Sequence, residues 1–235
     1  MKKARMKTGY YTPENVGKFS DALRGYFARI DAGEDLRVTI SHGNEKMGEV
    51  PSVSLLPFIS CPASCAGSCG KECYAAKIAL LYKTVLGSYA KNTAIALKRP
   101  ARFWEDVERA IMGTRFFRFH VSGDLLNAAY FEKMVEIAAR NPGTEILTFT
   151  KKWDIVNAFI DAGGEIPKNL HIVFSGWENL TPENPHGLPE SAVVMPGEDP
   201  APGWKTCGGN CFNCACRGFG CWTLGANETV CFKLH

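Results

Sequence analysis

The stretch RFFRFHVSGDLLNAAYFEKMVEIAARNPGTEILTFTKK, residues 115–152, carries the pattern that decides the fold. Residues 115–123 alternate between apolar and polar side chains, which predicts a strand ending in a small polar turn. Residues 128–141 have the period of an amphipathic helix, and residues 145–152 predict a second strand. Two strands joined by a helix of this length form a parallel pair, because the chain must cross over the sheet between them.

The same order of strand and helix continues on both sides of this stretch. Further strands are predicted over residues 52–60, 170–176, 190–197 and 228–234, and further helices over residues 12–33, 74–97, 102–112 and 153–164. This order predicts an α/β fold with a parallel sheet, either doubly wound or closed fully or partly into a (β/α) barrel. In each of these folds the functional groups gather at the C-terminal ends of the strands.

Composition limits the class of protein. The chain has 235 residues and a net charge of +3. It shows neither a signal-peptide pattern nor an apolar run long enough to cross a bilayer, so we expect a cytoplasmic protein that does not bind membranes. Its length fits one large domain with appendages, and we divide it into an N-terminal extension (1–50), a core (51–200) and a cysteine-rich C-terminal segment (201–235).

The ten cysteines fall into two groups. The first group is Cys61, Cys65, Cys69 and Cys73; the second is Cys207, Cys211, Cys214, Cys216 and Cys221, with Cys231 further on. In a reducing compartment, clustered cysteines indicate metal binding or redox chemistry rather than disulfides. The sequence therefore predicts two metal sites.

In the first group the thiols recur every four residues. Pro62, Gly67 and Gly70 oppose a helix there, so we expect a loop that wraps around an inorganic centre. Thiolate-only ligation within one tight loop favours a 4Fe–4S cluster over zinc or free redox thiols. In the second group, Cys207, Cys211, Cys214 and Cys221 are the expected ligands. Cys216 is spare and Cys231 is a core residue; iron–sulfur is favoured here, with zinc as the alternative.

Polar residues follow the predicted strands. His120 is expected to share a face with Phe116 and Arg118, because alternate residues of a strand point to the same side. Gly123 would let a ligand approach the backbone, and Asp124 would pair with an ammonium group or cap the next helix. Lys151 would meet a carboxylate or phosphate, or simply lie in solvent at the end of its strand.

Several motifs together resemble the phage and prophage family called gene product 88, which is similar to radical S-adenosylmethionine proteins with a Cys-Tyr-Ala motif. They are GNEKMG (43–48), SLLPFISCP (54–62), CGKECYAAK (69–77), FRFHVSGDLLNAAYF (117–131), LTFTKKW (147–153), TCGGNC (206–211) and CW (221–222). The resemblance implies a partial (β/α) barrel of the radical S-adenosylmethionine type with a cysteine-rich C-terminal extension. It also implies that the loop after the first strand holds a 4Fe–4S cluster.

The resemblance assigns Cys61, Cys69 and Cys73 to the family pattern, whereas Cys65 is additional. Three ligands would leave one iron open for S-adenosylmethionine; a fourth ligand would close the cluster. The same resemblance implies that a turn of small residues with an acid binds the cofactor, so His120, Ser122, Gly123, Asp124 and Lys151 are the candidate cofactor-binding residues.

Three hypotheses follow. The leading one is an iron–sulfur protein that cleaves S-adenosylmethionine reductively and acts on a substrate that the sequence does not identify. The second is a non-catalytic module, stabilised by iron–sulfur or zinc, that binds nucleic acid or a host protein. Lys98, Arg99 and Arg102 motivate the nucleic-acid partner. The third is an electron carrier with two closed clusters.

Overall fold

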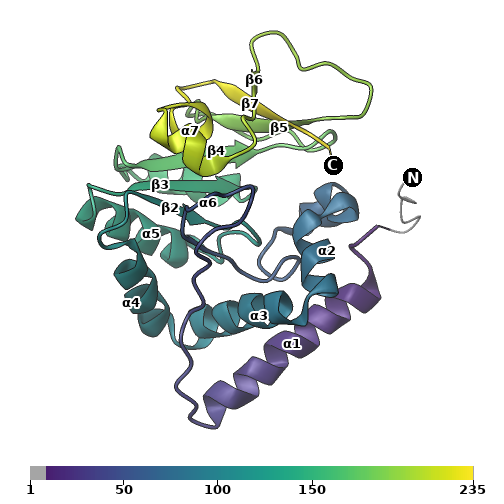
Figure 1. Ribbon diagram of the computed structural model, residues 1–235, viewed down its shortest axis with the longest axis vertical. Helices are drawn as coiled ribbons and strands as arrows, with labels where there is room; N and C mark the ends of the chain where they lie inside the picture. The colour runs from purple at the N-terminus through teal and green to yellow at the C-terminus, as the bar shows by residue number, and fades with distance from the viewer. Residues whose placement is uncertain (1–8, 235) are drawn as a thin grey trace.

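The chain forms an α/β fold around one seven-stranded sheet, as the computed structural model shows for residues 9–234 (Figure 1). All neighbouring strands are parallel, in the order β1-β2-β3-β4-β5-β7-β6. The strands are β1 (Ser52–Val53), β2 (Phe116–Phe119), β3 (Glu145–Thr150), β4 (Leu170–Ser175), β5 (Glu190–Val194), β6 (Lys205–Thr206) and β7 (Thr229–Lys233). The edge strands β1 and β6 do not pair with each other, so the sheet is open.

Helices connect the strands. They are α1 (Pro13–Asp31), α2 (Tyr74–Leu81), α3 (Lys83–Lys98), α4 (Pro100–Ile111), α5 (Ala128–Arg140), α6 (Trp153–Asp161) and α7 (Cys211–Cys216), with short 3-10 helices η1 (Ala63–Ala66), η2 (Cys69–Glu72) and η3 (Gly220–Trp222). Thr12 caps α1 by accepting a hydrogen bond from the Asn15 amide at 3.2 Å. Asn127 caps α5 in the same way. Side-chain acceptors at these positions satisfy amides that a helix start leaves free.

The strand order distinguishes the predicted alternatives. From β1 to β5 the strands lie in the order of the sequence, with no point at which the order reverses. A doubly wound sheet has such a reversal, so the doubly wound alternative is wrong. The parallel α/β prediction from residues 115–152 is confirmed, since β2 and β3 pair in parallel across α5.

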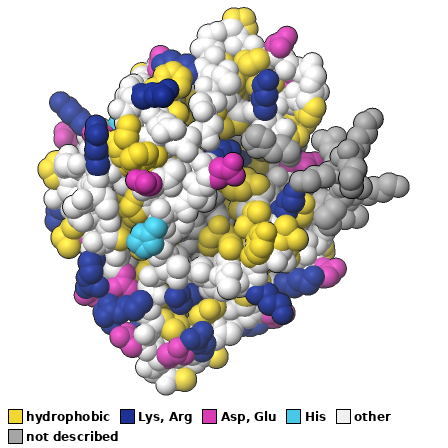
Figure 2. Space-filling view, in the orientation of Figure 1, with side chains coloured by type: hydrophobic (Ala, Val, Ile, Leu, Met, Phe, Trp, Pro, Cys, Tyr) yellow, Lys and Arg dark blue, Asp and Glu magenta, His cyan; other side chains and the backbone are white. Residues whose placement is uncertain are grey.

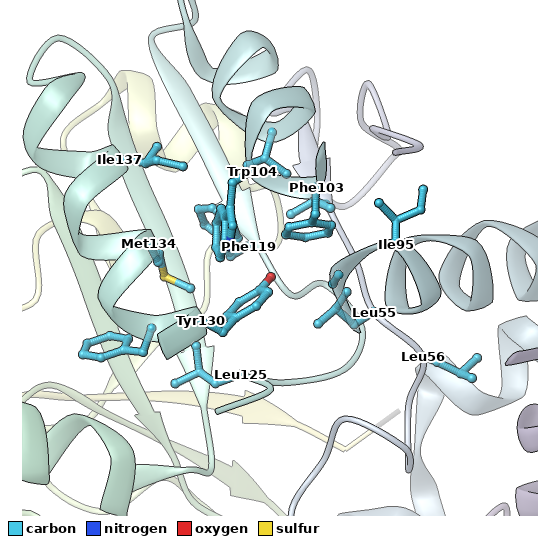
Figure 3. Close-up of a cluster of buried hydrophobic side chains, with 14 of the residues drawn as sticks. Leu55, Leu56, Ile95, Phe103, Trp104, Phe119, Leu125, Tyr130, Met134 and Ile137 are labelled. Carbon is cyan, nitrogen blue, oxygen red and sulfur yellow. The ribbon is translucent and has the colours of Figure 1, made fainter. Parts of the chain in front are cut away.

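One face of the sheet is covered by helices, with α4 and α5 visible on that side in Figure 1. Phe117 and Phe119 of β2 point into this core, together with Ile146 of β3. Figure 3 shows Trp104, Phe119 and Tyr130 packed together, and the rings of Trp104 and Tyr130 lie 4.6 Å apart. Burial of aromatic side chains on this scale supplies most of the stabilisation of such a layer.

The opposite face is covered by the cysteine-rich segment. Phe116, Leu147 and Val173, from three neighbouring strands, pack against Ala215 of α7 and Trp222 of η3. The segment 201–235 also contributes β6 and β7 to the sheet. Its cysteines are therefore carried by chain that is part of the sheet or packed on it.

Two predicted elements are shorter than expected. The strand predicted over 52–60 forms only at Ser52–Val53, although Leu55 still donates a hydrogen bond from its amide to the Ser122 carbonyl at 2.9 Å. The helix predicted over 74–97 is broken at Tyr82, which has extended backbone angles (φ −121°, ψ 107°) and separates α2 from α3. Within residues 9–234, the helices lack the combination of length and apolar character that crossing a membrane requires.

Candidate functional site

The loop that carries the first cysteine group leaves the end of β1 and wraps through η1 and η2. Its compactness depends on Gly70, because a Cβ atom there would lie 2.5 Å from the Cys65 carbonyl oxygen and 2.9 Å from Cβ of Tyr11. The last cysteine, Cys73, caps α2 by accepting a hydrogen bond from the Ala76 amide at 3.4 Å. The expectation that these cysteines do not lie on one α-helix is confirmed, because the segment holds only two short 3-10 helices before α2, whereas the inorganic centre stays a prediction.

The thiols of the first group are neighbours. Cys65 is 3% exposed, and interaction with the neighbouring thiols of Cys61 and Cys69 raises its pKa. Cys73 interacts electrostatically with the same two sulfurs. Interaction with Cys65 lowers the pKa of Cys69 to about 6, whereas burial raises the pKa of Cys73 to about 12. Cys61 and Cys69 are thus shared neighbours of both remaining thiols.

A lysine and a buried acid from the neighbouring strand ends lie beside this group. Lys151 follows β3 and donates from Nζ to Ser175 Oγ at 2.5 Å. The charge of Lys151 also lowers the pKa of Cys69, whereas the Asp124 carboxylate raises it. The sheet therefore brings Lys151 and Asp124 together with the first cysteine group, as expected for residues at the C-terminal ends of parallel strands.

Asp124 is 4% exposed and its carboxylate is held by three protein donors. Oδ1 accepts from Thr150 Oγ1 at 2.6 Å and from its neighbour Leu125, and Oδ2 accepts from the Lys151 amide at 2.8 Å. Burial raises the pKa of Asp124, and these hydrogen bonds oppose the rise. Asn127, not Asp124, caps α5, so the capping interpretation of Asp124 is wrong. A carboxylate accepts about four hydrogen bonds, so Oδ2 keeps room for one further donor.

Ser122 and Gly123 join the end of β2 to the chain after β1. Ser122 is buried and donates from Oγ to the Leu55 carbonyl at 3.0 Å. Gly123 has φ 81°, and a Cβ atom there would lie 2.5 Å from Ser60 Oγ and 2.8 Å from Cβ of Leu55. Close packing and a left-handed backbone therefore require the glycine. Its role toward a cofactor stays a prediction.

His120 does not share a face with Arg118, contrary to the expectation from alternation. His120 has φ 56°, and this left-handed residue ends the alternation of β2. Its ring lies on the helix-covered side, 3.1 Å from Tyr130 Oη and 3.3 Å from Thr148 Oγ1. Burial lowers the pKa of His120 to about 3, so the ring is neutral at physiological pH.

The second cysteine group lies on α7, on η3 and next to β6. Burial raises the pKa of Cys214, and the neighbouring thiols of Cys207 and Cys211 add to the rise. Cys221 interacts with all three. The Cys214 sulfur lies close over the backbone, because a Cβ atom at Gly208 would come within 2.8 Å of it. The expected set of Cys207, Cys211, Cys214 and Cys221 is therefore brought together.

The two remaining cysteines differ from this set. Cys216 is exposed, and Cys231 is buried in β7 with its sulfur 3.8 Å from Thr206 Oγ1. The loop of residues 44–47 holds α7 in place, because the Cys211 amide donates to the Lys46 carbonyl at 2.9 Å and the Phe212 amide to the Met47 carbonyl at 3.2 Å. A hollow of about 600 Å³ lies between this loop and the chain around Cys207 and Cys231.

Tyr74 joins the first cysteine group to the chain after β2. Tyr74 follows Cys73 and donates from its hydroxyl to the Val121 carbonyl. Burial raises the pKa of Tyr74 to about 12, and the charges of Arg118, Cys73 and Cys211 also act on it. The ring is nevertheless 58% exposed.

Exposed apolar side chains continue from Tyr74 along α2. Figure 2 shows hydrophobic side chains gathered over this helix, and Ile78, Leu81 and Tyr82 belong to the exposed set. The helix that follows the first cysteine group therefore carries an exposed apolar stretch.

The cations expected to favour nucleic acid are engaged within the protein. Lys98 pairs with Asp31 and Arg102 with Asp35, at 3.0 Å and 2.7 Å. Arg99 donates to the carbonyls of Ile30 and Glu34. These contacts reduce the charge available to phosphates, so the basic cluster gives the nucleic-acid hypothesis no structural support.

The donor chemistry of both groups fits a thiolate-bound metal. Each consists of neighbouring thiols, which are the ligands of iron–sulfur clusters and of structural zinc. Within residues 9–234, however, no group of three or more His, Cys, Asp or Glu side chains is already arranged to hold a metal ion. Binding would therefore have to draw the neighbouring thiols together.

Comparison with known proteins gives one match. The model of the family described as Gene product 88 matches residues 30–228, which include all the cysteines except Cys231. No curated protein and no solved structure matches the chain.

Proposed function

Since the chain belongs to the Gene product 88 family, we propose that it is an iron–sulfur protein that resembles radical S-adenosylmethionine enzymes. One observation carries the proposal: the loop after β1 gathers four cysteines between the strand and α2, and three of them, Cys61, Cys65 and Cys69, interact with one another. Such convergence has no evident purpose in a protein whose cysteines merely fill a core. It fits a metal centre at the end of β1.

The sheet supports the finer proposal of a partial barrel. A (β/α) barrel has strands in sequential order with helices on its outer face. From β1 to β5 this chain has sequential strands, and its main helical layer lies on one face. The cysteine-rich segment would then occupy the concave side, where barrel enzymes bind their ligands.

In this proposal Cys61, Cys69 and Cys73 hold a 4Fe–4S cluster. With one iron left open, such a cluster would supply the electron for reductive cleavage of S-adenosylmethionine. The chain's own contribution is electrostatic and positional. Lys151 places a positive charge beside Cys69 and favours its thiolate form. The acceptor site left on Asp124 Oδ2 suits an ammonium group, and the donors on its other sites fix the carboxylate in place.

Anaerobic reconstitution tests the proposal. We expect iron and sulfide in the protein, an electron paramagnetic resonance spectrum that changes when S-adenosylmethionine is added, and formation of 5′-deoxyadenosine after reduction. Protein that is folded but holds neither iron nor sulfide would reject the proposal. Protein with intact clusters that neither binds nor cleaves S-adenosylmethionine would reject the enzymatic part.

A second function, electron transfer by closed clusters, is favoured by the position of Cys65. Its thiol is buried next to Cys61 and Cys69, so Cys65 could serve as the fourth ligand of the cluster. The variant Cys65→Ser separates the two functions. If Cys65 closes the cluster, adding S-adenosylmethionine leaves the electron paramagnetic resonance spectrum of the wild type unchanged, and it changes the spectrum of the variant. If Cys65 is not a ligand, both proteins respond alike.

Two further variants serve as controls. Cys69→Ser removes a sulfur that neighbours two other thiols of the group, so the first cluster should be lost. Cys216→Ser changes an exposed cysteine outside both sets and should retain the iron content of the wild type. Equal iron loss in these two variants would show that the assignment of ligands is wrong.

A further inference from the structure

Arg118 is a half-buried cation on the cysteine-covered face of the sheet. Its Nη1 donates to Cys211 Sγ at 3.5 Å and to Met47 Sδ at 3.4 Å, and its Cζ lies 4.9 Å from the centre of the Phe149 ring. Its Nε is buried without a hydrogen-bond partner. Neutral sulfur is a weak acceptor, so the polar contacts of this guanidinium are poor for its charge.

The charge of Arg118 also lacks a carboxylate. Among residues 9–234, other arginines such as Arg102 and Arg140 form ion pairs, with Asp35 and Glu108. Arg118 forms none with any described Asp or Glu. A cation taken out of water without a counter-charge is costly. Something else in its surroundings has to supply negative charge.

The thiols of the second group are placed to do so. The Cys211 sulfur is in direct contact with the guanidinium, 3.5 Å from Nη1. Cys207, Cys214 and Cys221 pack against the same apolar cluster as Cys211. These sulfurs become negative when they bind a metal as thiolates. The contact between Arg118 and the Cys211 sulfur would then become stronger, because a hydrogen bond to a charged sulfur is stronger than one to a neutral sulfur.

We propose that Arg118 is the counter-charge of the second cysteine group and positions it for metal binding through the contact with Cys211. This inference rests on the proposed function, since it requires that Cys207, Cys211, Cys214 and Cys221 hold a metal. A fixed positive charge beside thiolates favours metal retention, and in an iron–sulfur cluster it favours the reduced, more negative state. Arg118 is a positioning residue in this role.

The guanidinium suits this position better than an ammonium group. Its plane stacks on Phe149 while one nitrogen reaches the sulfur. The variant Arg118→Lys keeps the charge, although an ammonium group does not reproduce the stacking. Arg118→Met keeps the length and removes the charge. Arg115→Met is the matched control, because Arg115 is exposed at the start of the same strand with its Cζ 5.0 Å from the Phe116 ring.

The experiment uses the full chain with Cys69→Ser as background, so that the second group is the metal centre under observation. Each variant is reconstituted anaerobically, and metal retention is measured by competition with a chelator. For Arg118→Met we expect retention at least about tenfold weaker than in the background. If the metal is an iron–sulfur cluster, its reduction potential should fall by the equivalent of about tenfold, which is about 59 mV for one electron.

The outcomes separate the inference from the proposed function. Equal retention in the background, in Arg118→Met and in Arg115→Met would overturn the inference and leave the second metal site standing. No metal in the background would overturn both. Arg118→Lys guards against a folding defect: it should retain metal within a few-fold of the background. If it loses metal as completely as Arg118→Met, charge is not the cause and the inference fails.

Discussion

The two faces of the sheet are built differently. The helix-covered face is closed by a large apolar core to which α3, α4 and α5 contribute, and its buried polar residues are neutral or hydrogen-bonded. The cysteine-covered face has a smaller apolar cluster around Phe116 and Trp222, and four cysteines are among the partly buried residues packed against it. Burial of hydrocarbon suffices on the first face, whereas the second combines a small core with an unpaired guanidinium and neighbouring thiols.

This difference assigns separate roles to the two faces. The helix-covered face fixes the strands, and with them the positions of Ser122, Asp124 and Lys151 at the strand ends. The cysteine-covered face is the part that a metal would stabilise, because thiolate ligation contributes folding energy where a small core cannot. The comparison can be tested by perturbing each face in turn.

The largest expected effect is that of metal removal. Chelation of the reconstituted protein should increase amide hydrogen exchange at least about tenfold in residues 205–234 and leave α4 and α5 protected. The measurement is hydrogen exchange followed by mass spectrometry, with chelator-treated Cys207→Ser protein as the control. Unchanged exchange in residues 205–234 would mean that the cysteine-covered face is held by its apolar contacts alone.

A core truncation on each face tests the contrast without metal. Phe119→Ala, on the helix-covered face, should lower the free energy of unfolding by about 3–5 kcal/mol, because the fully buried ring leaves a cavity among packed aromatic neighbours. Phe116→Ala, on the other face, should cost less in the metal-free protein, since the smaller cluster around it can collapse. Urea unfolding monitored by circular dichroism measures both. Equal costs would contradict the contrast.

Much of the helix-covered face can be predicted from the sequence, because it depends on local signals. Alternation in residues 115–119 predicts β2, and the amphipathic period of residues 128–140 predicts α5. The cysteine-covered face gives no such signals. β6 is only Lys205–Thr206, and the six residues of α7 are too few to show a period.

The errors within the site also have physical causes. The left-handed backbone of His120 places its ring on the opposite face from Arg118, and alternation in the sequence does not reveal such a residue. Arg118 depends on Met47 and Cys211, which are distant in the sequence. The grouping of the thiols is predictable from their spacing, whereas the contact of Arg118 with Cys211 requires the tertiary structure.

The neutrality of His120 gives the next prediction. Its pKa is lowered from 6.5 to about 3, mainly by burial. The native state therefore takes up fewer protons than the unfolded state below pH 6.5, and the stability present at pH 7 is lost as the pH falls toward 3. Between pH 7 and pH 5 we expect a loss of about 2 kcal/mol, which His120→Gln should largely abolish. Asp124, whose pKa burial raises, acts in the opposite direction in both proteins. Parallel pH profiles for the two proteins would contradict the assignment to His120.

The smallest effect on stability is expected at Asp124. In Asp124→Asn the amide oxygen can keep the hydrogen bonds from Thr150 and Leu125, but the amide nitrogen would face the Lys151 amide, another donor. The loss of that bond should cost about 1 kcal/mol, and relief from burying a charge offsets part of it. Asp199→Asn, at an exposed loop position, is the matched control and should change nothing. If the proposed function holds, Asp124→Asn weakens the spectral response to S-adenosylmethionine by much more than its small effect on urea unfolding. A response as strong as that of the Asp199→Asn protein would show that Asp124 only joins β2 to β3, and would remove it from the cofactor-binding residues.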